Sequence, residues 1–178
     1  MGKRILAICL DCGDTLIDEG TEEKNEQGVS LRADYIPGAP ELMWELKRRG
    51  YRLALVADGP SATFTNNLGP SGIYELFDAY VISDVLGVSK PDALMFRTAL
   101  DQLGIPYEAA PQVVMVGNNL ERDIKGANAM CMISVWLDWA PRRSKIPADE
   151  LERPQFTIKT PLALLDVLDN LEHENSLP

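Results

Sequence analysis

The chain has 178 residues, of which 46% are hydrophobic and 25% are charged, and it carries a formal net charge of −10. This length holds one domain with a buried core, and the composition is that of a globular protein. A chain this acidic lacks the basic surface that a phosphate backbone requires, so we expect no nucleic-acid partner. No stretch has the roughly 18 consecutive apolar residues of a membrane span, and no signal-peptide cleavage site follows the N-terminal apolar run. We therefore expect a cytoplasmic protein without membrane contact.

The cysteines and the single histidine narrow the possible chemistry. Three cysteines without the spacing of a disulfide framework fit a reducing compartment. Cys9 and Cys12 form a C-x-x-C pair, which is either a redox pair or one core thiol beside one loop thiol. We favour the second interpretation because Gly13 follows the pair, where a redox site has a helix that lowers the thiol pKa. His173 lies in a charged segment, so no histidine remains for a Ser-His triad or a zinc site.

The first strong pattern is the apolar run 5–10, which leads directly into Asp11. A short, continuous apolar run predicts a strand that is buried on both faces of a parallel sheet. Such a strand delivers its next residue to the carboxyl edge of the sheet, where ligands bind in open α/β folds. Asp11 is therefore placed where its charge can act on a ligand.

Strands and helices alternate along the rest of the chain. Residues 17–36 are polar and predict a loop or a loose hairpin. Further strands are predicted at 53–57, 80–83, 113–116 and 133–137. Helices are predicted between Pro40 and Gly50, near 61–68 and 72–77, between Asp92 and Gly104, at 121–130 and at about 160–174. This alternation predicts a three-layer α/β/α sandwich around a parallel sheet of about five strands, in a single domain over residues 1–178.

Distinctive polar residues stand at four strand ends. They are Asp11, Asp58, Lys90 and the segment 118–123. In a doubly wound sheet these ends gather at one edge. Asp11 and Asp123 offer hard oxygen ligands that suit Mg²⁺, and Lys90 offers a positive charge for a carboxylate or a phosphate. Gly59 allows backbone N–H groups to approach an anion. The set predicts metal-assisted chemistry on an anionic substrate.

Over about residues 4–145 these motifs resemble those of the haloacid dehalogenase-like (HAD) superfamily. The family's D-x-D-x-T motif corresponds to residues 11–15, its lysine before a proline to Lys90, and its G-D-x-x-x-x-D motif to residues 117–123. The resemblance implies a Rossmann-like core and an aspartate nucleophile, Asp11, that forms an aspartyl intermediate. It also implies Mg²⁺ as the cofactor of the many phosphatases in the family.

The chain departs from the family pattern at three site positions. Gly13 stands where the family's phosphatases have the aspartate that acts as general acid and base, although its carbonyl remains a potential metal ligand. Such a proton-transfer group is worth about 3–5 kcal/mol of barrier. Ala57 replaces a serine or threonine and Asn118 replaces an aspartate, so we expect fewer contacts to phosphate and weaker binding of Mg²⁺. Asp14 lies one residue beyond Gly13 and substitutes as the acid only if the turn is reshaped.

The candidate site residues fall into three groups. The catalytic candidates are Asp11, Lys90 and Asp14. The substrate-binding candidates are Ala57, Asp58, Gly59 and Asn119. The metal-binding candidates are Asp11, Gly13, Asn118 and Asp123.

We expect a Mg²⁺-dependent phosphatase that acts on a small phosphorylated or otherwise anionic substrate through an aspartyl-phosphate. Two alternatives stay open. One is a catalytically impaired HAD-like module that binds a ligand or a protein partner, and the other is a metal-independent hydrolase of the dehalogenase type. Residues 17–36 are too few for a cap domain, so we expect an open site that a second copy in a homo-oligomer could cover. The basic residues Arg142, Arg143 and Lys145 either reach this site or are solvated.

Overall fold

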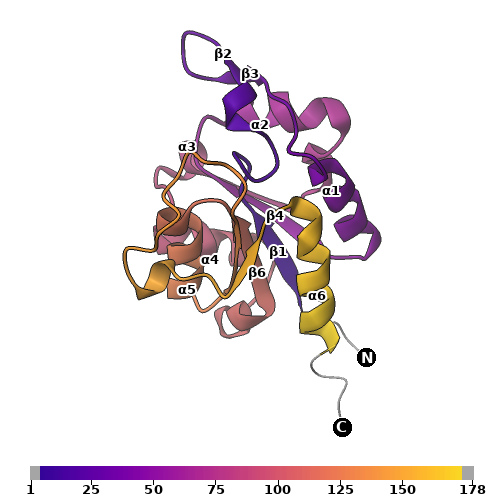
Figure 1. Ribbon diagram of the computed structural model, residues 1–178, viewed down its shortest axis with the longest axis vertical. Helices are drawn as coiled ribbons and strands as arrows, with labels where there is room; N and C mark the ends of the chain where they lie inside the picture. The colour runs from indigo at the N-terminus through magenta and orange to yellow at the C-terminus, as the bar shows by residue number, and fades with distance from the viewer. Residues whose placement is uncertain (1–4, 174–178) are drawn as a thin grey trace.

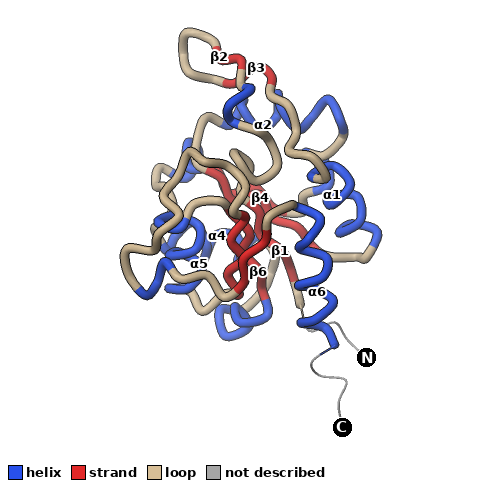
Figure 2. The backbone as a smooth tube through the Cα atoms, viewed as in Figure 1, coloured by secondary structure: helices blue, strands red, loops and turns tan. Residues whose placement is uncertain are grey.

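The computed structural model describes residues 5–173, and a parallel β-sheet forms their centre (Figures 1 and 2). Its six described strands lie in the order β5-β4-β1-β6-β7-β8, and every neighbouring pair is parallel. The strands are β1 (Ala7–Leu10), β4 (Arg52–Ala57), β5 (Ala79–Ile82), β6 (Val113–Gly117), β7 (Ile133–Leu137) and β8 (Phe156–Ile158).

Helices cover both faces of this sheet and complete the predicted three-layer α/β/α sandwich (Figure 1). The α-helices are α1 (Ala39–Arg48), α2 (Ser61–Leu68), α3 (Ser83–Leu86), α4 (Ala93–Gln102), α5 (Lys125–Ala129) and α6 (Leu164–His173). A π-helical turn, Leu120–Ile124, leads into α5. Short 3₁₀ turns lie at Glu19–Thr21, Gly69–Ser71, Tyr74–Leu76, Tyr107–Gln112, Glu150–Glu152 and Pro161–Ala163.

The alternation of side chains along β1 divides the core into two layers. Ile8 and Leu10 belong to the apolar cluster that includes α1 and α6, whereas Ala7 and Cys9 belong to the cluster that includes α4. Successive residues of a strand point to opposite faces of the sheet, so both faces of β1 are buried. This is the physical reason why β1 is apolar throughout, and it confirms the central strand that the apolar run predicted.

The structure differs from the predicted elements in detail. The sheet has a sixth strand, β8, at its edge. Its three residues are half-buried, exposed and buried in turn, so they form no continuous apolar run that the sequence could reveal. The helix predicted at 121–130 begins as the π-helical turn before α5. The helix predicted at about 160–174 is a 3₁₀ turn followed by α6, and residue 174 lies outside the described residues.

The segment between β1 and α1 forms a small hairpin where a cap domain would stand. Its strands, β2 (Glu23–Lys24) and β3 (Ser30–Arg32), are antiparallel, and in Figure 1 the hairpin lies beside α2 at the top of the view. Ser30 fastens it to α2, because its N–H donates to Thr63 Oγ1 at 3.1 Å and its carbonyl accepts from Asn66 Nδ2 at 3.0 Å. Of the loop or loose hairpin predicted for residues 17–36, the structure has a hairpin, and hydrogen bonds hold it against α2.

β1 occupies the point where the order of the sheet reverses. From β1 the chain adds β4 and β5 on one side and β6, β7 and β8 on the other. In such sheets ligands bind in the crevice beside this reversal, at the carboxyl ends of the strands. The residues that follow β1, β4 and β6 are therefore brought to one edge.

The thiols of the C-x-x-C pair are both free and buried. Burial raises the pKa of Cys9 to about 12. Burial, together with the charge of Asp11, also raises the pKa of Cys12. A raised pKa suppresses the thiolate that redox exchange requires, which supports the interpretation as structural thiols. The described residues also contain no helix with the length and apolar character needed to cross a bilayer.

Helix α5 packs closely on α4, and this contact gives a test of the fold. A Cβ on Gly126 would lie 2.1 Å from Phe96 Cε2, and Phe96 is fully buried. We predict that Gly126→Ala lowers the free energy of unfolding by about 1–3 kcal/mol, measured in urea, because the core has no room for the methyl group. Adding Phe96→Leu should make room, so the double variant should lose less than the sum of the two single losses. Losses that add to within about 0.5 kcal/mol would contradict this contact.

Candidate active site

Lys90 lies at the centre of the site and joins three parts of the sheet edge. Its Nζ donates to Asp11 Oδ1 at 2.8 Å, to Asp123 Oδ1 at 2.7 Å and to the Val56 carbonyl at 2.9 Å. Asp11 follows β1, Val56 belongs to β4, and Asp123 lies in the turn after β6. The lysine side chain is only 2% exposed. Three acceptors satisfy all three protons of the buried ammonium.

The charges in this cluster compensate one another. Burial alone would lower the pKa of Lys90, but Asp11, Asp123 and Asp58 outweigh it and raise that pKa, so the ammonium stays charged. Burial and repulsion from Asp11 raise the pKa of Asp123, against the opposing effect of Lys90. One buried lysine therefore offsets the repulsion between carboxylates that the fold brings together.

The turn after β6 aims Asp123 at this lysine. The Asn119 side chain caps the turn by accepting from the N–H groups of Glu121 at 3.0 Å and Arg122 at 3.3 Å. The Asn119 N–H in turn donates to Asp123 Oδ2 at 3.0 Å. Gly117 is required for space, since a Cβ there would lie 2.2 Å from Asp123 Oδ2. Asn119, predicted to bind substrate, thus also shapes the turn.

Asp58, directly after β4, is a third carboxylate of the cluster and holds the backbone of Lys90. Asp58 Oδ1 accepts from the Lys90 N–H at 3.0 Å, and Asp58 Oδ2 lies 3.4 Å from Arg122 Nη1. The Gly59 N–H donates to Ser83 Oγ at 2.9 Å, so in this structure it is engaged by the protein itself. Ala57 is fully buried at the end of the strand.

A polar cavity of about 60 Å³ opens beside Asp11. Seven predicted residues line it: Asp11, Gly13, Asp58, Lys90, Asn118, Asn119 and Asp123. Glu19, Arg122 and Arg143 complete the lining. Glu19 and Arg122 were not assigned to the site from the sequence, and Arg143 comes from the basic loop whose position the sequence left open. A small cavity with this lining suits a compact anion together with a cation.

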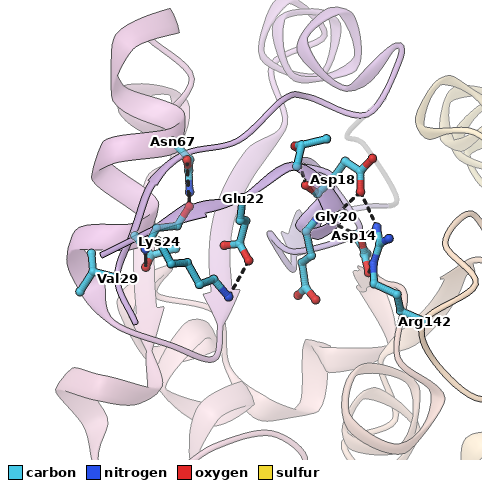
Figure 3. A network of polar contacts seen from close by, with 12 residues as sticks. Asp14, Asp18, Gly20, Glu22, Lys24, Val29, Asn67 and Arg142 are labelled. Atoms are coloured by element: carbon cyan, nitrogen blue, oxygen red, sulfur yellow. Dashed lines mark hydrogen bonds and ion pairs between the residues drawn. The ribbon is translucent and has the colours of Figure 1, made fainter. Parts of the chain in front are cut away.

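Asp14 is turned away from the cavity and holds the basic loop. Arg142 binds it in a bidentate pair, with Nε 2.9 Å from Oδ2 and Nη2 2.5 Å from Oδ1, and also contacts Asp18 (Figure 3). The Asp14 carboxylate is completely buried, and its Oδ1 also accepts from the Glu19 N–H at 3.1 Å. Its backbone φ of 50° is a left-handed conformation that aspartate tolerates better than most residues.

Glu19 occupies the space beside Gly13. A Cβ on Gly13 would lie 2.1 Å from Glu19 Oε1 and 2.9 Å from Glu19 Cδ. Gly13 is not among the described glycines with positive φ, and a side chain there would have to move the end of the Glu19 side chain aside. Glu19 Oε2 lies 3.3 Å from Arg143 Nη2. Burial and the charge of Asp14 raise the pKa of Glu19, while Arg143 opposes them.

Long-range pairing decides the positions of the residues that the sequence missed or left open. Arg142 and Arg143 lie more than 120 positions from their partners Asp14 and Glu19. The available signals were weak: an acidic run after the first strand and a basic loop after the fifth, each of which is also typical of solvated surface. Lys145, the third basic residue of the loop, pairs instead with Asp138 at 2.5 Å.

The oxygen donors at the cavity fit a hard divalent cation. Asp11, Gly13, Asn118 and Asp123 offer two carboxylates, a backbone carbonyl and an amide, which are ligand types that Mg²⁺ accepts together with several waters. Within residues 5–173 no three His, Cys, Asp or Glu side chains gather into a metal-binding group. Lys90 also engages one oxygen of each carboxylate. The donors therefore include the oxygen types that Mg²⁺ prefers, but only two of them are negatively charged.

A sequence model of the haloacid dehalogenase-like hydrolases matches residues 13–130. The match covers two thirds of the chain and includes Lys90, Asp123 and the strands on both sides of β1. The chain therefore belongs to the haloacid dehalogenase-like hydrolase family, as its motifs indicated.

Two curated relatives carry phosphatase names. A glyceraldehyde 3-phosphate phosphatase of Methanopyrus kandleri is 35% identical over 132 residues, which are 74% of this chain and 55% of that protein. A phosphoserine phosphatase of Thermus thermophilus is 37% identical over 123 residues, which are 68% of this chain and 46% of that protein. The chain thus spans about half the length of these relatives.

Solved structures show the same fold. A HAD phosphatase from Thermococcus onnurineus superposes with a TM-score of 0.74 at 18% identity, over 92% of this chain and 98% of that one. A similarity at this level of identity establishes the architecture of the sheet and its helices.

Arg142 and Arg143 are adjacent, so they give a matched test of how the basic loop is held at the site. We predict that Arg142→Ala lowers the free energy of unfolding by about 3 kcal/mol, because the completely buried Asp14 carboxylate loses its partner. Arg143→Ala should change it by less than about 1 kcal/mol, because that side chain is 42% exposed and has one long contact. Urea unfolding of both variants checks this, and equal losses would contradict the anchoring role of Asp14.

Proposed function

We propose that this protein is a Mg²⁺-dependent phosphatase of small phosphate monoesters that acts through an aspartyl-phosphate on Asp11. The observation that carries the proposal is the position of Asp11 at the mouth of a small polar cavity, held by a buried lysine. The phosphatase names of the relatives support the reaction class, and two of these names point to glyceraldehyde 3-phosphate and phosphoserine as substrates to try first.

Each residue around the cavity has a separate task in this proposal. Asp11 attacks phosphorus with the oxygen that Lys90 does not bind, and the bond from phosphorus to the alcohol oxygen breaks, so the alcohol leaves. Lys90 and Arg143 stabilise the charge on the phosphoryl oxygens. Asp58 and Asp123 keep the lysine in place through the bonds described above. Water then attacks the phosphorus of the acyl phosphate, which releases inorganic phosphate and regenerates the Asp11 carboxylate.

A magnesium ion in this site would be held by Asp11, Gly13, Asn118 and Asp123. When bound, such an ion supplies positive charge that stabilises the phosphoryl oxygens and orients them. The chain itself provides only two carboxylates for it, because Asn118 is neutral. We therefore propose that the affinity for Mg²⁺ is low and rises if a carboxylate is restored.

A catalytically impaired binding module is the second candidate. Two observations favour it: Ala57 offers no hydroxyl to a phosphate, and the Gly59 N–H is engaged by Ser83. Such a protein would bind a phosphorylated ligand without turning it over, so a measurement of turnover separates the two candidates.

The nucleophile can be tested by one substitution. We predict that Asp11→Asn abolishes hydrolysis of p-nitrophenyl phosphate and phosphoserine, because an amide oxygen is too weak a nucleophile to form the acyl phosphate. Asp101→Asn, at an exposed site on α4, is the matched control and should retain full activity. Steady-state release of phosphate is the measurement. Activity in Asp11→Asn equal to that of the control would refute the assignment, and no activity in the unaltered protein would favour the binding module.

The metal requirement can be tested by chelation and by a charge change. We predict that EDTA removes the activity and that added Mg²⁺ restores it. Asn118→Asp should lower the Mg²⁺ concentration for half-maximal activity by about tenfold, since one more charge near the ion is worth about 1–4 kcal/mol. Titration calorimetry with Mg²⁺ alone gives a reading that does not depend on activity. An unchanged affinity in Asn118→Asp would contradict the assigned ligand.

A further inference from the structure

We propose that Glu19 is the proton-transfer residue of this site and takes over the task of the carboxylate that is missing at position 13. This inference rests on the proposed phosphatase function. It is carried by the juxtaposition of Glu19 Oε1 with the space that a side chain on Gly13 would fill.

The geometry places a carboxylate from a distant part of the loop where a short side chain at position 13 would begin. The distance of 2.1 Å from Glu19 Oε1 to a Cβ on Gly13 is less than any real contact allows. A side chain at residue 13 would therefore have to displace the Glu19 carboxylate, which fills that space in this structure. Gly13 is not among the described glycines with positive φ, and its lack of a side chain leaves this space to the Glu19 carboxylate.

Elimination among the carboxylates leads to the same residue. Asp123 is held between Lys90 and the Asn119 N–H, and Asp58 between the Lys90 N–H and Arg122. Asp14 is completely buried in its bidentate pair with Arg142. Glu19 lines the cavity with a side chain that is 30% exposed, and its pair with Arg143 is long, at 3.3 Å. Besides the nucleophile Asp11, it is the carboxylate on the described cavity wall that is best able to reach a reacting oxygen.

The surrounding loop fixes the position of Glu19. It is the first residue of the 3₁₀ turn Glu19–Thr21, which Asp18 caps by accepting from the Gly20 N–H at 2.8 Å. Its own N–H donates to Asp14, and Arg142 ties Asp14 to Asp18 (Figure 3). Asp14 thus acts as a positioning residue for Glu19. This role accounts for the buried ion pair of Asp14 with Arg142 beside the cavity.

Glu19 acts in both proposed steps, first as an acid and then as a base. In the first step an Asp11 oxygen bonds to phosphorus, the bond from phosphorus to the leaving oxygen breaks, and the protonated Glu19 carboxyl gives its proton to that oxygen. In the second step the Glu19 carboxylate takes a proton from water as the water oxygen bonds to phosphorus. The bond from phosphorus to Asp11 then breaks, so phosphate leaves and both residues return to their starting forms.

The first test compares leaving groups in Glu19→Gln, which keeps the shape of the side chain. With phosphoserine, whose alkoxide leaves poorly, turnover should fall by about 10²-fold or more. With p-nitrophenyl phosphate the first step needs no acid, so a stoichiometric burst of nitrophenol should remain and be followed by a slow steady state. Glu23→Gln, at an exposed position of β2 in the same hairpin, is the control and should match the unaltered protein.

The second test moves the carboxylate to position 13. Gly13→Asp alone should displace the Glu19 side chain, because the two carboxylates cannot occupy the same space. Gly13→Asp combined with Glu19→Ala should turn over phosphoserine at least about tenfold faster than Glu19→Ala alone, since a carboxylate returns to the same space. Thermal unfolding of all variants checks that each is folded, and the isosteric Glu19→Gln carries the test if the alanine variant is not.

The outcomes separate this inference from the proposed function. Activity in Asp11→Asn would overturn the proposed function and this inference with it. Loss of activity in Asp11→Asn, together with full turnover of phosphoserine in Glu19→Gln, would overturn the role of Glu19 alone. Equal losses on both substrates with no burst, or no recovery in the double variant, would also overturn it.

Discussion

The site depends on one buried ammonium shared between two carboxylates. Lys90 binds Asp11 and Asp123 at 2.8 and 2.7 Å, and it reaches the backbone of β4 as well. Removing one partner of a buried ion pair typically costs about 3–5 kcal/mol, because the remaining charge has no solvent. The lysine therefore allows Asp11 and Asp123 to lie close together at this edge of the sheet. The nearby glycine and asparagine serve the same arrangement, since Gly117 leaves room for Asp123 and Asn119 directs it.

A second ionic network connects the first strand to a loop over a hundred residues away. Arg142 neutralises the buried Asp14, and through Asp18 it also holds the turn that carries Glu19. The part of the cavity wall formed by Glu19 and Arg143 therefore comes from two loops that this network holds together. The lysine cluster holds the proposed nucleophile at the end of a central strand, and the arginine network holds the proposed proton-transfer group in a loop. Gly13 has no side chain, and the Glu19 carboxylate fills the space that one would take.

Much of the fold followed from local patterns, while parts of the site did not. The apolar runs of β1, β4 and β6 predicted buried parallel strands because both faces of these strands are covered. Because the carboxyl ends of parallel strands meet at one edge, the same patterns also predicted that Asp11, Lys90 and Asp123 lie together. β8 gave no signal because an edge strand of three residues carries no continuous apolar run. Glu19 and Arg142 could not be placed because their roles arise from pairing between loops, and an acidic or basic loop residue is equally typical of solvated surface. Asp14 looked like a possible acid, and only its burial with Arg142 assigns it a different task.

The central claim is that Asp11 becomes phosphorylated during turnover. The most direct measurement is acid quenching of the unaltered protein while it hydrolyses p-nitrophenyl phosphate with Mg²⁺ present, followed by peptide mass spectrometry. The account predicts a phosphoryl group on the peptide that contains Asp11, and the loss of this group on treatment with hydroxylamine, which cleaves acyl phosphates. Turnover that proceeds with the phosphoryl group on another residue, or with none on the protein at any quench time, would contradict it.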